Sequence, residues 1–297
     1  MQTIEELRGR INITESLHSV VGTMKALAAV SIQQLEGVVR SIDRYNRSVE
    51  LGLQAVLRNR PRDVRLVEPA LSDELGVVIF GSDQGMCGQF NEEIVSHAIE
   101  DMKGRNVSGS GTVILAVGAR AAMQLELAGE AIDDLLSIPA SPGAISPVVE
   151  EIAIQIERWQ AEREIDRIVL YHHRRSSAGR YRPTTHRLLP IDRAWLDRVE
   201  AQRWPTRVLP TFAMPWRPLF AELLQQHILV TVNRSIAHSM MSEQTARMIS
   251  MQAAEKNIEE RLEELNARFR TTRQTVITAE LLDIVSGFEA LRSPGDV

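Results

Sequence analysis

Apolar residues follow a helical period over the first sixty residues of the chain. The stripe has steps of three and four and is interrupted by the polar Ser31: Leu17, Val20, Met24 and Leu27 precede it, and Leu35, Val38, Ile42, Tyr45, Val49, Leu53 and Val56 follow it. The spacing is typical of a heptad stripe with one stutter near Leu35. No proline interrupts residues 1–60. We predict one helix here that must pack its stripe against a partner, since four glycines weaken it.

The C-terminal stretch carries a second stripe. Its members are Ala237, Met240, Gln244, Arg247, Met251, Ala254, Ile258, Leu262, Leu265, Phe269, Thr272, Val276 and Ala279. Residues 219–293 contain no proline and one glycine, which permits a single helix of roughly 110 Å. The N-terminal helix is the obvious cover for this stripe. We therefore predict an antiparallel coiled coil formed by the two ends of the chain.

The middle of the chain alternates short apolar runs with helical patterns. Strands are expected at 76–81, 112–117 and 167–172, with an edge strand at 181–189, and helices at 90–102, 119–127 and 145–159. This alternation indicates βαβ units. The predicted fold class is α/β: a doubly wound, mostly parallel sheet domain inserted between two long terminal helices. The expected divisions are 1–60, 61–215 and 216–297.

Composition excludes several classes of protein. The net charge of -5 and the 4% aromatic content argue against a nucleic-acid binder. The single cysteine excludes an internal disulfide and a multi-cysteine metal site. The apolar runs are too short to span a membrane, and the N-terminus lacks the form of a signal peptide. We expect a soluble, cytoplasmic chain.

Residues 81–88, GSDQGMCG, form the most suggestive loop for chemistry, because they follow a strand and precede a helix. Their glycines fit neither GxGxxG nor a P-loop. A tight connection that uses Gly85 and Gly88 is one interpretation, and a nucleotide site is the other. Cys87 within the loop is expected to be a packed structural thiol, since no Cys–His signature accompanies it.

Other polar residues give weaker signals. His172 and His173 are adjacent in a strand and should point to opposite faces, and no metal-ligand spacing occurs, so we expect no metal site. A run of five arginines follows, at Arg174, Arg175, Arg180, Arg182 and Arg187; it could meet an acidic or phosphate surface or be a solvated loop. No paired-carboxylate active site is present. The chemistry favours a non-catalytic mechanical or scaffolding part without a cofactor.

Three segments of the chain resemble the gamma subunit of F-type ATP synthases. Residues 242–254, SEQTARMISMQAA, are similar to the family's SEQxARMxAMxxA. Residues 273–287, RQTVITAELLDIVSG, resemble its RQxxITxELxEIVxG ending, and residues 83–91, DQGMCGQFN, its DxGLCGxxN loop. Residues 7–11 and 23–29 match more loosely. The resemblance frames nearly the whole chain, whereas about 103–215 are recognisable only by their pattern.

The resemblance implies a rotor shaft rather than an enzyme. Family members place an antiparallel coiled coil in the axis of a hexamer of alpha and beta subunits, and their α/β foot binds the epsilon subunit and the membrane c-ring. No nucleic acid or direct small-molecule substrate is implied. The implied location is peripheral, at the cytoplasmic face of the bacterial inner membrane. Matched to the family's motifs, the expected beta-subunit contacts are Arg273, Gln274, Thr278, Glu280, Met24, Lys25 and Arg247.

The chain also departs from the family's pattern. Residues 30–36, VSIQQLE, replace a basic stretch, which should weaken the grip on an acidic lever. Gln252 replaces a usual lysine, and the regulatory cysteine pairs of chloroplast members are absent, so thiol control is not expected. The divergence resembles the alternative F-type ATPases of some bacteria. Two other functions stay open: a coiled-coil scaffold unrelated to rotation, and a nucleotide-binding α/β enzyme that uses the 81–88 loop.

Overall fold

The computed structural model describes residues 3–64, 74–105, 111–176, 179–208 and 210–292. It consists of two compact units, one formed by Met1–Leu27 with Met248–Val297 and the other by Ala28–Arg247. The two long helices, α1 (Ile4–Arg58) and α6 (Trp216–Arg292), each contribute to both units. The predicted terminal helices are thus confirmed. The division into 1–60, 61–215 and 216–297 remains a prediction about the organisation of the chain.

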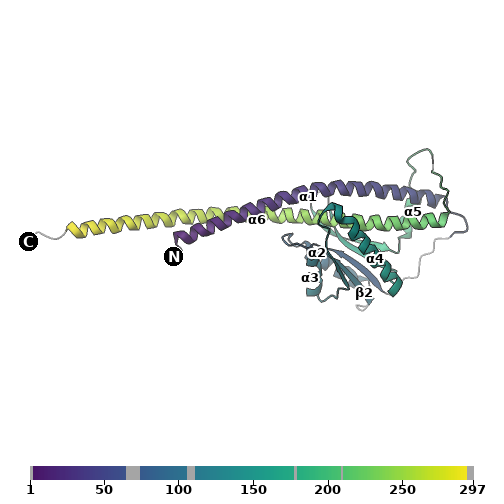
Figure 1. Ribbon diagram of the computed structural model, residues 1–297, viewed down its shortest axis with the longest axis horizontal. Coiled ribbons are helices and arrows are strands. Elements are labelled where there is room, and N and C mark those ends of the chain that lie inside the picture. The colour runs from purple at the N-terminus through teal and green to yellow at the C-terminus, as the bar shows by residue number, and fades with distance from the viewer. Residues whose placement is uncertain (1–2, 65–73, 106–110, 177–178, 209, 293–297) are drawn as a thin grey trace, which may run out of the picture. The chain divides into compact units, whose positions relative to one another are not determined.

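The unit Ala28–Arg247 is built on a five-stranded sheet (Figure 1). Its strands are β1 (Leu75–Phe80), β2 (Thr112–Val117), β3 (Asp134–Leu136), β4 (Ile168–Arg175) and β5 (Tyr181–Leu189). They lie in the order β3-β2-β1-β4-β5. All neighbouring pairs are parallel except β4 with β5 at the edge. The expected mostly parallel sheet with an edge strand is therefore confirmed.

Helices cover both faces of this sheet. The central strands carry apolar residues on both faces, so each face must be shielded from water. Val77 and Ile79 of β1 pack with α2 (Phe90–Gly104) and α3 (Ala119–Leu127). Val78 and Phe80 face the other way, toward α4 (Ile145–Arg163) and toward residues of α1 and α6 from the same unit. Burial of apolar side chains therefore stabilises the packing of helices on both faces of the sheet.

The same alternation decides where the two adjacent histidines point. His172 of β4 lies opposite His238 of α6, with ring centroids 6.5 Å apart. His173 points to the other face and stacks on Phe90 of α2 at 4.3 Å. The prediction that the two rings face opposite sides of the sheet is confirmed.

The structure contains elements that the periodicity did not predict. The strand β3 has only three residues, and α5 (Arg193–Ala201) is a nine-residue helix. The Asp192 carboxylate caps α5 by accepting from the Ala194 amide at 2.9 Å. Both elements are too short to display a period, which explains the omission. The helix α4 also runs four residues beyond its predicted end, to Arg163.

A third apolar cluster of this unit joins α1, α5 and α6. Leu53 and Val56 of α1 pack with Leu196 of α5 and with Phe220 and Val230 of α6. The Trp216 indole donates to the Val56 carbonyl at 2.7 Å. The first turn of α6 is therefore fixed to the end of α1, so α6 starts from a rigid base.

Gly81, immediately after β1, is a position where only glycine fits. A Cβ there would lie 2.3 Å from the Ala121 Cβ and 2.8 Å from the Asn91 Oδ1. We expect Gly81→Ala to lower the free energy of unfolding by about 2–3 kcal/mol, because the α3 backbone would have to move. Urea unfolding followed by tryptophan fluorescence measures this, since all four tryptophans lie in this unit.

Gly37→Ala is the matched control for that substitution. Gly37 lies within α1, and a Cβ there has nothing within 4 Å. We expect it to raise the stability by about 0.5–1 kcal/mol, because alanine is the better helix former. Equal effects of the two substitutions would contradict the close contact at Gly81.

Candidate functional site

In the unit Met1–Leu27 with Met248–Val297, α1 and α6 pack along a narrow seam. Leu7 and Ile11 of α1 are buried against Leu265, flanked by Leu262 and Phe269 of α6. The Arg8 guanidinium lies 5.9 Å from the centre of the Phe269 ring, within cation–π range. The antiparallel coil predicted from the two ends of the chain is confirmed here.

The register of the α1 seam differs from the predicted stripe. Leu17, Val20 and Leu27 were expected to face α6, yet each remains more than half exposed, at 52%, 54% and 62%. One unbroken heptad series is instead buried or half-buried at every position: Leu7, Ile11, Thr14, His18, Val21, Lys25, Ala28, Ile32, Leu35, Val39, Ile42, Asn46, Val49, Leu53 and Val56. The predicted stutter near Leu35 is therefore wrong.

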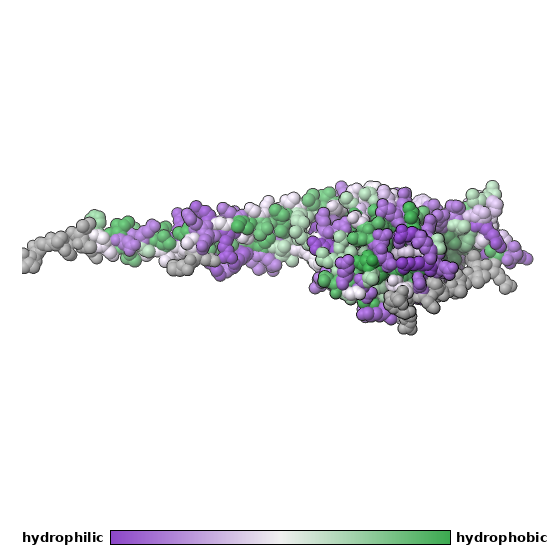
Figure 2. Space-filling model, turned by 60° about the horizontal axis from the view of Figure 1, so that its bottom comes forward, coloured by the Kyte–Doolittle hydropathy of each residue, from purple (hydrophilic) through white to green (hydrophobic). Residues whose placement is uncertain are grey.

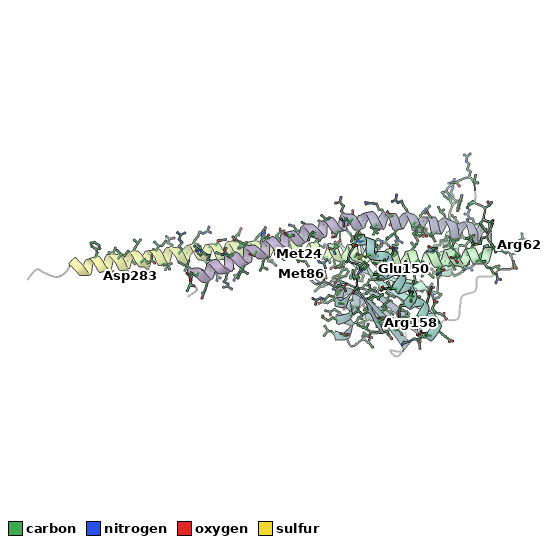
Figure 3. The ribbon with its side chains drawn as sticks, viewed as in Figure 1. Met24, Arg62, Met86, Glu150, Arg158 and Asp283 are labelled. Carbon is green, nitrogen blue, oxygen red and sulfur yellow. The ribbon has the colours of Figure 1, made fainter. Side chains whose placement is uncertain are left out.

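Polar pairs across the seam explain that error. Lys25 of α1 forms an ion pair with Glu255 of α6, and the His18 Nε2 lies 3.4 Å from the Glu259 Oε1. These positions are polar, so a search for apolar periodicity passes over them and selects the more apolar face beside them. Lys25, expected to contact a beta subunit, is half-buried and already paired within the coil. Met24 lies beside it on α1 and is half-buried (Figure 3).

The face of α1 that the prediction buried is an exposed apolar surface. Ile13, Leu17, Val20 and Leu27 follow steps of four, three and seven residues, which place them on one side of the helix. We call these four residues the outer α1 stripe. The described chain leaves the stripe uncovered, and an apolar series of this kind indicates an interaction surface. The sequence shows that these residues share one face of α1, but it does not show whether that face packs against α6 or is exposed.

The predicted contacts at the C-terminal end of α6 are all exposed. Arg273 and Glu280 are seven residues apart and share a face, and Gln274 and Thr278 are four apart on the adjoining face. The Thr278 hydroxyl donates to the Gln274 backbone carbonyl at 2.8 Å, and the Gln274 side-chain amide forms no hydrogen bond within the described residues. The structure therefore brings these four residues together within two and a half turns. Side chains project from all sides of this part of α6, around Asp283 (Figure 3).

Large apolar side chains surround this polar group. They are Val276, Ile277, Leu281, Leu282, Ile284, Val285 and Phe288, each exposed by at least 37%. Hydrophobic residues are visible on the surface of this segment in Figure 2. A helix that is apolar on every side is normally enclosed by other chains. Val276 belongs to the predicted seam stripe, yet within the described residues the apolar seam ends at Phe269 and Thr272.

Arg247, the remaining predicted contact, lies in the other unit and is buried. Its guanidinium donates to the Glu243 carboxylate at 2.7 Å and to the Gly85 carbonyl at 3.5 Å. Both side chains of the ion pair are more than 90% buried. Burial raises the pKa of Glu243, although Arg247 acts in the opposite direction. Arg247 therefore holds the 81–88 loop against α6.

The loop is held in place by Asn91, the second residue of α2. Asn91 accepts from the Ser82 amide at 2.9 Å and donates to the Ser82 hydroxyl at 2.8 Å. Met86 and Gly88 have φ values of 63° and 59°. This left-handed conformation explains why glycine is favoured at position 88. Gly85 supplies the carbonyl that Arg247 binds. The loop is thus a tight connection between β1 and α2.

Cys87 has the environment of a structural thiol. It is 2% exposed and packs with Phe90 and Ala246. Burial raises its pKa above the usual value, so the reactive thiolate is disfavoured. A hollow of about 300 Å³ lies beside the loop, and the charged residues that line it are Asp83, Glu243 and the already paired Arg247, a set that does not suit a phosphate.

Comparison with known proteins agrees with this arrangement. Residues 3–291 match the profile of the ATP synthase family. An ATP synthase gamma chain from Nitrosomonas europaea is 22% identical over 303 residues, covering 98% of this chain and 100% of that protein. The corresponding gamma chain from Nostoc punctiforme is 26% identical over 320 residues, with the same coverage.

The chain belongs to the ATP synthase gamma family.

Solved structures of family assemblies share the fold. The rotor of the Euglena gracilis mitochondrial ATP synthase matches with a TM-score of 0.62 at 17% identity, covering 92% of this chain and 98% of that chain. The central stalk of the Tetrahymena thermophila enzyme matches with a TM-score of 0.55 at 19% identity, covering 79% and 99%. The resemblance of the motifs to this family is confirmed. Among the described residues, none of the helices combines the length and apolar character that a bilayer crossing requires.

Proposed function

We propose that this chain is the central rotor shaft of a rotary F-type ATP synthase, coupling ion flow through a c-ring to ATP synthesis or hydrolysis. The observation that carries this proposal is the C-terminal segment of α6, which is exposed and apolar on every side with Arg273 and Gln274 at its base. A free protein gains nothing from such a surface. An axle that turns inside a ring of subunits needs it on all sides, because each face meets the ring in turn.

The proposed partners follow from the family. The alpha and beta subunits would surround α6 and the outer α1 stripe, and the α/β foot would bind the epsilon subunit and the c-ring. The chain would be a non-catalytic subunit without a cofactor, peripheral to the cytoplasmic face of a bacterial inner membrane. Burial of Cys87 and the 81–88 loop that Asn91 holds in place support this over a nucleotide-binding enzyme.

The predicted beta-subunit contacts divide into two groups on structural grounds. Arg273, Gln274, Thr278 and Glu280 are exposed and unobstructed, so we propose direct contact for them. Lys25 and Arg247 are engaged by Glu255 and Glu243. For these two we propose that the role is to stiffen the shaft, and that Met24 and the outer α1 stripe make the contact. The neutral-to-acidic 30–36 segment implies a weaker grip at that level than in relatives with a basic stretch.

The assembly itself tests the function. The tagged chain would be purified from native membranes, and its native mass and ATPase activity measured. We expect a large complex with one copy of this chain per three catalytic subunits and ion-coupled ATPase activity. Recovery alone or as a dimer with itself would support the scaffold alternative instead.

The contacts at the base of the exposed segment give a sharper prediction. We expect the Arg273→Ala/Gln274→Ala variant to lower the ion-coupled ATPase activity of the assembled complex by about tenfold, since charge-assisted hydrogen bonds are worth about 1.5 kcal/mol or more. Tryptophan fluorescence should show unchanged unfolding. Lys256→Ala, which removes an exposed charge from the same helix, is the control. Unchanged coupling in the double variant would contradict the proposed contact.

A further inference from the structure

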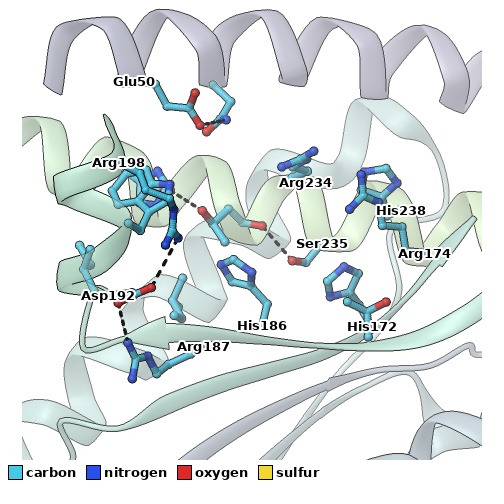
Figure 4. Close-up of a pocket in the computed structure, with 17 residues that line it drawn as sticks. Glu50, His172, Arg174, His186, Arg187, Asp192, Arg198, Arg234, Ser235 and His238 are labelled. Carbon is cyan, nitrogen blue, oxygen red and sulfur yellow. Dashed lines mark hydrogen bonds and ion pairs between the residues drawn. The ribbon is translucent and has the colours of Figure 1, made fainter. Parts of the chain in front are cut away.

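A cavity of about 400 Å³ lies within the unit Ala28–Arg247, between the β4–β5 edge of the sheet, α5 and α6 (Figure 4). The arginines that line it are Arg174, Arg187, Arg198 and Arg234. Against them, the described lining residues bring two carboxylates, Glu50 and Asp192. Two of these arginines belong to the arginine run of the sequence, which the rotor function does not use. The wall therefore carries an excess of positive charge.

The positive charges gather at two ends of the cavity (Figure 4). At one end, Arg187 and Arg198 each lie near an Asp192 oxygen, at 3.5 and 3.6 Å, too far for strong hydrogen bonds. At the other end, Arg234 pairs with Asp43 at 3.0 Å. The guanidinium group of Arg174, nearby, has no ion pair or hydrogen bond within the described residues. Both ends thus keep guanidinium groups with unused donors.

Unpartnered ring nitrogens lie at the end of the cavity that Arg174 and Arg234 line (Figure 4). His172 and His238 are 6% and 7% exposed. The His172 Nδ1, both ring nitrogens of His238 and the Thr184 hydroxyl have no hydrogen-bond partner in the part of the chain that the structure describes. Buried polar atoms are nearly always satisfied in folded proteins. One polar ligand in this cavity could satisfy several of these atoms together.

The electrostatics of the histidines fit an anion. Burial, and then the positive charges of Arg234 and Arg174, lower the pKa of His238 to about 4. Burial and the neighbouring histidines and Arg174 lower the pKa of His172 to about 3. The described residues contain no group of three His, Cys, Asp or Glu side chains arranged as metal ligands. The two rings are therefore uncharged near neutral pH, when each can donate one hydrogen bond, and an anion would offset the repulsion among the four arginines.

We propose that this cavity binds a small anion carrying two linked phosphate groups, one at each end. Guanidinium groups match phosphate oxygens in geometry and charge, and a site with two basic ends selects a ligand with two anionic groups. The volume lies within the range of small-molecule sites. The proposal is independent of the rotor function, because it rests only on residues of this cavity.

Isothermal titration calorimetry of the full chain with inorganic pyrophosphate, in a buffer without phosphate, tests the proposal. We expect one site per chain. Arg174→Gln at one end and Arg198→Gln at the other should each weaken binding at least tenfold. Arg174 makes no ion pair among the described residues, so its replacement should leave the fold intact, which thermal unfolding checks. Arg158→Gln, an exposed arginine of α4 (Figure 3), is the matched control and should bind within twofold of the unaltered chain.

Titrations with other anions show which part of the ligand the cavity recognises and whether the ligand is a nucleotide. ADP that binds as tightly as pyrophosphate would show that the diphosphate alone is recognised, and tighter binding would identify a nucleotide. Inorganic phosphate should bind at least tenfold more weakly, because it reaches one end only. The proposal would be overturned by absence of pyrophosphate binding at millimolar concentration. Equal affinities of phosphate or citrate, or Arg174→Gln and Arg198→Gln variants that bind like Arg158→Gln, would overturn it as well.

Discussion

Replacing Arg247 by methionine should lower the free energy of unfolding by about 3 kcal/mol. The change keeps the aliphatic stem but leaves the Glu243 carboxylate buried without a counter-charge, and breaking a buried pair typically costs about 3–5 kcal/mol. Burial already raises the pKa of Glu243, so the carboxylate can take up a proton when Arg247 is absent. Protonation limits the cost to the lower end of that range. Urea unfolding at pH 7.5, followed by tryptophan fluorescence, measures it.

The double variant Arg247→Met/Glu243→Leu separates the lost pair from lost packing. With both charges removed, no uncompensated group remains, and we expect most of the stability to return. The Arg247→Met cost should also shrink as the pH falls from 7.5, because the raised pKa of Glu243 favours its protonated form, which needs no counter-charge. A double variant that is as unstable as the sum of its two single variants would contradict a coupled pair.

Acidification from pH 7.5 to 5.0 should destabilise the unit Ala28–Arg247 by at least about 3 kcal/mol. Burial lowers the pKa of His172 and His173 to about 3, and of His227 and His238 to about 4. Below the ordinary histidine pKa of about 6.5, these side chains are protonated in the unfolded chain but remain neutral in the folded chain. The contribution of these histidines to the free energy of unfolding is therefore fully present above about pH 6.5, and it is lost as the pH falls toward 3–4. For His172 and His173, the loss at pH 5 is roughly 2 kcal/mol each.

His173→Phe tests the source of this acid sensitivity. The His173 ring is fully buried between Phe90 and Tyr181, with ring centroids at 4.3 and 5.1 Å, so phenylalanine can keep the stacking. We expect the variant to lose roughly 2 kcal/mol less than the unaltered chain between pH 7.5 and 5.0. Raised pKa values of Glu93 and Glu243 act in the opposite direction and reduce the total. An unchanged pH slope in the variant would assign the acid sensitivity to other groups.

The polar seam of the coiled coil bears on the rotor function. Lys25 and His18 occupy core positions of the heptad and face Glu255 and Glu259 across it. Polar pairs at such positions fix the register of two helices, at some cost in stability. A shaft that transmits torque needs a fixed register more than a large apolar core. The apolar residues that the seam does not use are then available on the outer α1 stripe.

Several features followed from the sequence because they depend on local periodicity or on one chain segment. The long helices, the order of strands and helices in the middle, and the opposite orientation of His172 and His173 are of this kind. Helical and strand periods repeat many times in such segments, so single exceptions do not hide them. The motifs of residues 242–254 and 273–287 likewise identified the family, which the comparisons confirmed.

Other features were decided only when distant segments came together. The seam phase of α1 depends on Lys25 meeting Glu255, and the burial of Arg247 depends on Glu243 and Gly85, and none of these pairings is a periodic property. The basic cavity joins side chains from α1, β4, β5, α5 and α6, separated by up to 192 residues along the chain between Asn46 and His238. The sequence by itself thus determined the elements and the family. Tertiary structure decided which charges are paired, which apolar face is exposed, and where unpaired cations gather, because each is set by packing between segments.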